Sequence, residues 1–157
     1  MQTKIIIESG EKVMNRVQKI AWLFVVTISL AVILSITATA LLYVKVGMPR
    51  AQAGLAFLAI AAFGGLGPLI FKKDKEPVTC DERDKLINHR AAIVGFGASY
   101  LVVGVACMAP FSALGPNASI SVTWLPMIFV AAGLTLFFAH SVAILVQYGW
   151  RDKGEKS

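Results

Sequence analysis

The sequence predicts an all-α, polytopic membrane protein: a bundle of four transmembrane helices with both termini in the cytoplasm. Apolar residues make up 57% of the chain and charged residues only 15%, whereas soluble domains have about 45–50% and about 25%. The apolar residues gather in four runs without Asp, Glu, Lys or Arg, and the charges between the runs are unevenly distributed. This composition excludes a water-soluble enzyme domain and a disordered chain.

Each of the four apolar runs is long enough to cross the hydrocarbon core of a bilayer, which takes about 20 helical residues. The runs cover residues 20–44, 51–71, 91–109 and 124–148. A helix satisfies its own backbone polar groups in lipid, and the runs do not alternate as the strands of a membrane barrel do. We therefore expect four transmembrane helices in a single membrane domain that covers residues 1–157.

The orientation follows from the cations. Thirteen of the fifteen Lys and Arg residues lie before the first run, between the second and third runs, or after the fourth. Lys45 and Arg50 are the two exceptions, and all nine carboxylates lie on the side of the thirteen cations. Lys and Arg near the ends of a span resist translocation, so this side is expected to be cytoplasmic.

The segment before the first span, at about residues 10–19, is expected to be an amphipathic helix in the headgroup layer. Val13, Met14, Val17 and Ile20 recur at helical spacing, and cations occupy the other faces. Such cations contact anionic lipid. No nucleic-acid recognition motif accompanies them, so we expect the lipid bilayer as a partner and no nucleic acid.

The loop between the second and third spans predicts a helical extension over residues 80–90. Thr79 followed by Glu82 fits a capping box, which places the helix start near Cys80. Asp81, Glu82 and Asp84 suit the positive end of the helix dipole. With no Pro or Gly before Gly95, this helix should continue into the third span and stand about two turns above the membrane.

Two stripes separate on this extension at the spacing of successive helical turns. The polar stripe consists of Asp81, Asp84, Lys85 and Asn88. The other stripe consists of Arg83, Leu86, Ile87 and Arg90. This second stripe continues into a column of small residues, Ala91, Gly95 and Ser99. Small residues let another helix approach closely, so we expect a packing seam with Arg83 at its foot. Arg83 either bonds the terminal carbonyls of the second or fourth helix, pairs with a carboxylate, or recognises a ligand or partner.

The cluster Asp81-Glu82-Arg83-Asp84, with Ile87 and Arg90-Ala91 entering a span, resembles an uncharacterised family of small four-helix prokaryotic membrane proteins. The closing Leu145-Val146-Gln147-Tyr148-Gly149 is similar to that family too. The resemblance covers spans two to four loosely. It implies this topology and a multi-pass protein of a prokaryotic inner membrane, and it implies no activity and no catalytic residue.

His140 is the only side chain within the four runs that titrates near neutral pH. A proton relay needs a second titratable group, and the runs contain no Asp, Glu or Lys. We expect an interhelical hydrogen bond for His140, with a metal, haem or proton role as the alternative. One transmembrane His cannot hold a metal ion alone, so no metal and no cofactor is expected.

Cys80 and Cys107 lie about 40 Å apart on one continuous helix, which excludes a disulfide between them. The chain has no CxxC motif and no oxyanion site beside a cysteine, so we do not expect an enzyme. The expected function is that of a small accessory or regulatory membrane protein. It would act through helix packing and its charged cytoplasmic face, as a homo-oligomer or with a membrane protein partner. The alternative is a subunit of a small transporter or channel.

Overall fold

The computed structural model describes residues 16–47, 50–71, 82–117 and 119–154. The described chain consists of α1 (Arg16–Val46), η1 (Arg50–Leu66) with its continuation α2 (Gly67–Ile70), α3 (Glu82–Leu114) and α4 (Trp124–Gly154). It contains four helical segments long and apolar enough to cross a membrane, and the residues described include no strand. The prediction of an all-helical chain with four candidate spans is confirmed.

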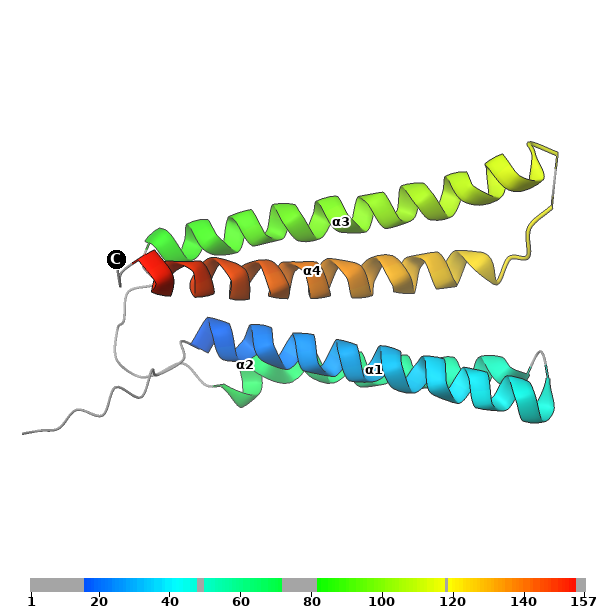
Figure 1. Cartoon of the computed structure of the whole chain (residues 1–157), viewed down its shortest axis with the longest axis horizontal. Helices are drawn as coiled ribbons and strands as arrows, with labels where there is room; N and C mark the ends of the chain where they lie inside the picture. The colour runs from blue at the N-terminus through cyan, green and yellow to red at the C-terminus, as the bar shows by residue number, and fades with distance from the viewer. Residues whose placement is uncertain (1–15, 48–49, 72–81, 118, 155–157) are drawn as a thin grey trace, which may run out of the picture.

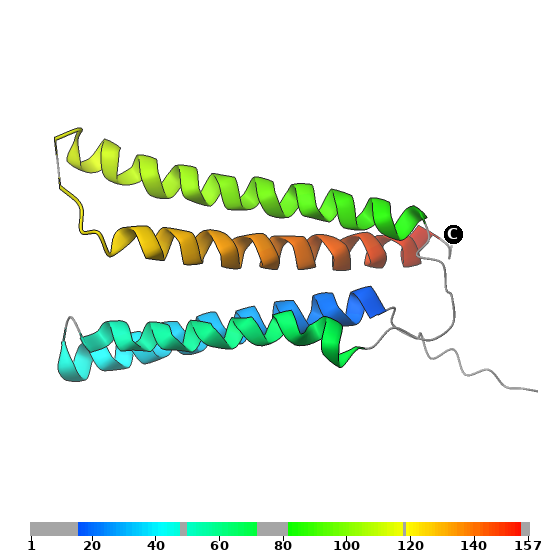
Figure 2. The same ribbon diagram turned by 180° about the vertical axis from the view of Figure 1, so that it is seen from behind.

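The four segments form two hairpins that meet along one seam. η1 packs on α1, α3 packs on α4, and the hairpins join through α1 and α4. The order of neighbours is therefore η1, α1, α4, α3, and both views show α3 on the side of α4 that faces away from α1 (Figures 1 and 2). One consequence is that the outer faces of α3 and η1 have no neighbour within the described chain.

Three of the helices are longer than a bilayer requires, and most of the additional residues lie at one end of the molecule. α1 and α4 have 31 residues and α3 has 33, which corresponds to about 46–50 Å against about 30 Å of hydrocarbon. Compared with the apolar runs, the largest additions are the start of α3 and the end of α4. The start of α1 lies at the same end of the molecule (Figure 1). We call this the charged end.

The second span differs from the expected helix in its winding. η1 is a 3-10 helix of 17 residues, and α-helical geometry begins at Gly67, next to Pro68. A 3-10 helix rises about 2.0 Å per residue, so this short span still extends nearly as far as α1. Side chains at i and i+3 eclipse in such a helix. This aligns Ala51 with Gly54, and Gly64 with Gly67, and all four residues are buried.

The second span lies close to α1, which explains why its buried positions are Ala and Gly. A Cβ atom on Gly64 would lie 2.6 Å from Cδ1 of Phe24 and 2.9 Å from Oγ1 of Thr27, and one on Gly54 would lie 2.8 Å from Cα of Thr39. Neither site has room for a side chain. η1 therefore packs closely against α1 at both Gly54 and Gly64.

The core is made mainly of small residues. Ala31, Ala51 and Ala91 are fully buried, and Ser35 and Ser141 are nearly so. Large apolar side chains point outward instead, with Leu69 73% and Phe129 81% exposed. This distribution is typical of helices that pack closely within lipid, where large apolar side chains need no shelter from water.

Candidate functional site

The charged end brings together the start of α1, the end of α2, the start of α3 and the end of α4 (Figure 1). A buried cluster holds three of these helices together: Ala21 from α1, Ile87 and Ala91 from α3, and Ile144 and Tyr148 from α4. This is the one place where residues from both hairpins form a common hydrophobic core among the described residues. It fixes the first turns of α3 against the last turns of α4.

A hydrogen bond between two helices closes the cluster. The hydroxyl of Tyr148 donates to Oδ1 of Asp84 over 2.6 Å, and Tyr148 is only 9% exposed. This distance falls in the range of charge-assisted O–H···O⁻ bonds. The sequence placed Tyr148 at the end of a span, where aromatic residues commonly anchor a helix at the headgroups. Its hydroxyl is instead used to bind α3.

The two predicted stripes on the start of α3 need correction. Asp84 lies half-buried on the same face as buried Ile87 and Ala91, whereas Leu86 is 48% exposed and Arg90 is exposed. The packing seam therefore runs through Asp84, Ile87 and Ala91, and the expected pairing of Leu86 and Arg90 with that seam was wrong. Asp84 can face inward because the Tyr148 hydroxyl donates a hydrogen bond to its carboxylate at the edge of the core.

The outward face of the same helical turns is charged. Glu82, Lys85, Asn88, His89 and Arg90 are all exposed. We call these five residues the platform. The Arg83 side chain, Asp81 and the expected capping box at Thr79 lie outside what the structure describes, as does the segment at residues 10–15.

Arg16 performs the carbonyl-binding role considered for Arg83. Its Nε donates to the backbone oxygen of Phe71, and Nη2 donates to that of Pro68 at 3.2 Å. Both carbonyls lie at the end of the second span, where a helix leaves carbonyl groups without internal partners and where its dipole favours a cation. Arg16 thereby ties the start of α1 to the end of α2. The sequence showed Arg16 only as one of several cations before the first span.

His140 is half-buried and lies at a close approach of α4 to α3. A Cβ atom built on Gly95 would lie 3.1 Å from Cβ of His140 and 2.8 Å from the backbone oxygen of Leu136. The predicted use of Gly95 for close helix packing is thus present. The imidazole of His140 makes no hydrogen bond to any residue that the structure describes, so the expected interhelical hydrogen bond is not formed there.

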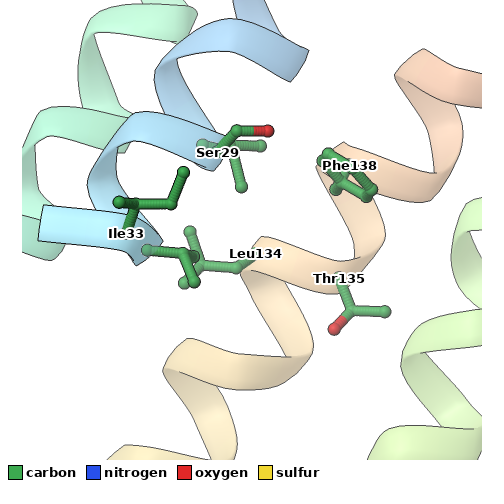
Figure 3. Close-up of a pocket in the computed structure, with 7 residues that line it drawn as sticks. Ser29, Ile33, Leu134, Thr135 and Phe138 are labelled. Carbon is green, nitrogen blue, oxygen red and sulfur yellow. The ribbon is translucent and has the colours of Figure 1, made fainter. Parts of the chain in front are cut away.

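Two shallow cavities lie along α1. One of about 420 Å³ opens between α1 and α4, and Figure 3 shows Leu134 of α4 directed towards Ile33 of α1 across it. The other, of about 460 Å³, lies between α1 and η1 near Ser35 and Thr39. The Thr39 hydroxyl is buried without a hydrogen-bond partner among the described residues. Both cavities are lined mainly by apolar side chains, as is typical of grooves that face lipid acyl chains.

Metal and thiol chemistry find little support in the described part of the chain. No group of three or more His, Cys, Asp and Glu residues is close enough there to hold a metal ion. Cys107 is a free, exposed thiol, and Cys80 lies outside the described residues.

Comparison with protein-family models, with curated proteins and with solved structures finds no significant match to this chain. The resemblance carried by Asp81-Glu82-Arg83-Asp84 therefore stays a prediction.

Proposed function

We propose that this chain is a small accessory or regulatory protein of a prokaryotic inner membrane, with both termini in the cytoplasm. The charges support this orientation. In the sequence, thirteen of its fifteen Lys and Arg residues lie before the first apolar run, between the second and third runs, or after the fourth. Lys45 and Arg50 lie between the first and second runs. Cations concentrate on the cytoplasmic side of multi-pass proteins.

The observation that carries the proposal is that contacts with α4 hold the first turns of α3, which bear the platform, in a fixed position. Asp84 and Ile87 bind the start of α3 to Tyr148 and Ile144 of α4, so the backbone that bears the platform is held in place. The platform side chains are exposed. A surface whose backbone is already ordered loses little conformational entropy when a partner binds, which favours recognition.

The chemistry of the platform indicates the partner. Lys85 and Arg90 are exposed cations, and His89 lies between them along the helix. In the proposed topology they stand just above the membrane surface, where the cytoplasmic segment of another membrane protein would meet them. We propose that an acidic segment of this kind binds here, because complementary charge steers association and selects the partner.

Photo-crosslinking in native membranes tests this proposal. A photoreactive residue at Asn88 should give a defined crosslinked product, and a double charge reversal, Lys85→Glu with Arg90→Glu, should reduce its yield at least tenfold. The matched control is Lys45→Glu, which reverses an exposed cation at the opposite end of α1 and should leave the product unchanged. A product that survives the double reversal, or the absence of any protein product, would refute the platform as a recognition surface.

A further inference from the structure

The second span has an unusually extended winding, and both of its ends are attached to α1. η1 is a 3-10 helix of 17 residues, although such runs rarely exceed about four residues because their hydrogen-bond geometry is poorer than that of an α-helix. At one end the Ala51 N–H donates to the backbone oxygen of Gly47 at 3.3 Å. At the other end Arg16 donates to the backbone oxygens of Pro68 and Phe71. The span therefore has to cover the length of α1 that separates these two attachments (Figure 2).

The two attachments account for the 3-10 winding. From Ala51 to Ile70 the observed span rises about 36 Å, at about 2.0 Å per residue as far as Leu66 and about 1.5 Å per residue after it. Wound as an α-helix throughout, the same residues would rise only about 28 Å. The carbonyl groups that Arg16 binds would then lie about 8 Å from their present positions, whereas a hydrogen bond needs about 3 Å between donor and acceptor. The hydrogen bonds of Arg16 thus hold the span in its extended winding.

The two windings match bilayers of different thickness. The uncharged residues 51–71 rise about 31 Å as an α-helix and about 39 Å in the observed winding. A typical hydrocarbon core is about 30 Å thick. Each ångström of mismatch between a span and the bilayer has a modest cost in free energy. A thin bilayer therefore favours the α-helical winding, and a thick bilayer favours the extended one.

The winding also decides which residues of the span face α1. In the observed structure Gly64 and Gly67 are buried, as Ala51 is, and Ala62 and Gly65 are exposed. An α-helix turns by about 100° per residue, so with Ala51 kept in place it would turn Gly64 and Gly67 about 140° to 160° away from α1. Ala62 and Gly65 would come to within about 40° of the Ala51 face. Small residues therefore face α1 in both windings, and each winding has a face that packs closely.

We propose that the second span is a length switch that responds to bilayer thickness. Its long form is the observed one, in which Arg16 is bound to its end and Gly64 and Gly67 lie against α1. Its short form is an α-helix that is released from Arg16, with Ala62 and Gly65 against α1. The two forms differ in length by about 8 Å, and the thickness of the bilayer sets their ratio.

The distance between two spin labels within the span tests the proposal. Gln52→Cys and Ile70→Cys are labelled in the full chain, after Cys80→Ser and Cys107→Ser, and both labelled positions are exposed. Their backbone separation should be about 34 Å in the long form and about 27 Å in the short form. Pulsed electron paramagnetic resonance should show the long distance in phosphatidylcholine vesicles with erucoyl chains. The short distance should predominate in vesicles with the much shorter myristoleoyl chains.

Two further variants act on opposite forms. Arg16→Met removes the hydrogen bonds that hold the long form, so in vesicles with oleoyl chains it should raise the ratio of short to long form about fivefold. Gly65→Ile adds a side chain where a Cβ atom meets nothing within 4 Å in the long form, but where α1 would lie in the short form. The short distance should then be absent in every bilayer. Lys45→Met removes an exposed cation from the other end of α1. It is the matched control and should leave the ratio unchanged.

A second label pair, at Val26→Cys and Val44→Cys, controls for the fold of α1. Both residues are exposed, and they are separated by as many positions as the first pair. Their backbone separation should stay near about 27 Å in every bilayer and every variant. If Arg16→Met disturbs this distance, the thickness series of the chain that retains Arg16 decides alone.

Three results would overturn the proposal. The first is the long distance in every bilayer, since a span that never shortens is no switch. The second is the short distance in every bilayer, because the long form would then not exist in lipid. The third is a short form that persists in Gly65→Ile, which would contradict the rotation of the span. A ratio that Arg16→Met leaves unchanged while α1 stays intact would refute the role of Arg16 in holding the long form.

Discussion

The hydrogen bond from Tyr148 to Asp84 can be removed without changing the shape of the core, because Tyr148→Phe deletes only the hydroxyl. A hydrogen bond to a charged group contributes about 1.5–3 kcal/mol to stability. The bond is short, at 2.6 Å, and Tyr148 is 9% exposed, but Asp84 is only half-buried. Water can therefore partly replace the lost donor, and we expect a loss at the lower end, about 1.5 kcal/mol.

A double-mutant cycle isolates this pair. Asp84→Ala also removes a carboxylate from the first turn of α3, where it interacts favourably with the helix dipole. Comparing Tyr148→Phe, Asp84→Ala and the double variant cancels that separate effect. The free energies of unfolding are measured by circular dichroism in mixed micelles of increasing dodecyl sulfate fraction. The coupling energy should be about 1–1.5 kcal/mol.

Tyr43→Phe is the control, since Tyr43 is 58% exposed near the other end of α1 and should lose almost nothing. A coupling energy below about 0.5 kcal/mol would be within ordinary additivity error. That result would refute the conclusion that Tyr148 fastens the start of α3.

Three further predictions follow from other contacts. Arg16→Met keeps the aliphatic part of the side chain but removes both hydrogen-bond donors to the end of α2. It should lower the free energy of unfolding by about 1 kcal/mol. An unchanged unfolding midpoint in mixed micelles would contradict this role of Arg16. Gly54→Ala should lose about 1–3 kcal/mol in the same assay through overpacking, whereas Gly65→Ala, whose Cβ atom meets nothing within 4 Å, should be neutral or slightly stabilising. Finally, liposomes loaded with a pH-sensitive dye should show no proton flux that His140→Ala abolishes, and a flux lost in that variant would favour transport over the accessory function.

Much of the local structure follows from composition alone. Four uncharged runs of about 20 residues predict four membrane-length helices, because a helix is the simplest way to satisfy backbone groups in lipid. The small residues that follow Ile87 predict close packing as far as Gly95, and the structure places Gly95 against His140. These features depend on neighbours along one helix, which the sequence displays directly.

The site was less accessible to sequence reasoning. Arg16 binds the carbonyls at the end of the second span, 52 to 55 positions along the chain, and the sequence did not single it out for this role. Asp84 was assigned to the polar stripe, but Tyr148 turns it towards the core from 64 positions away. Both contacts join partners that are distant in sequence. The spacing of residues along a single helix says nothing about them.

The sequence by itself determined the helical class, the number of spans and the uneven distribution of charge, since each is a response of a chain segment to lipid and water. The tertiary structure decided how each helix is rotated about its axis and which helices are neighbours. A span that is apolar on all sides meets lipid equally well in any rotation, so hydropathy cannot select one. That choice rests on contacts such as those of Gly54, Gly95 and Tyr148, where close packing or a hydrogen bond favours one neighbour over lipid.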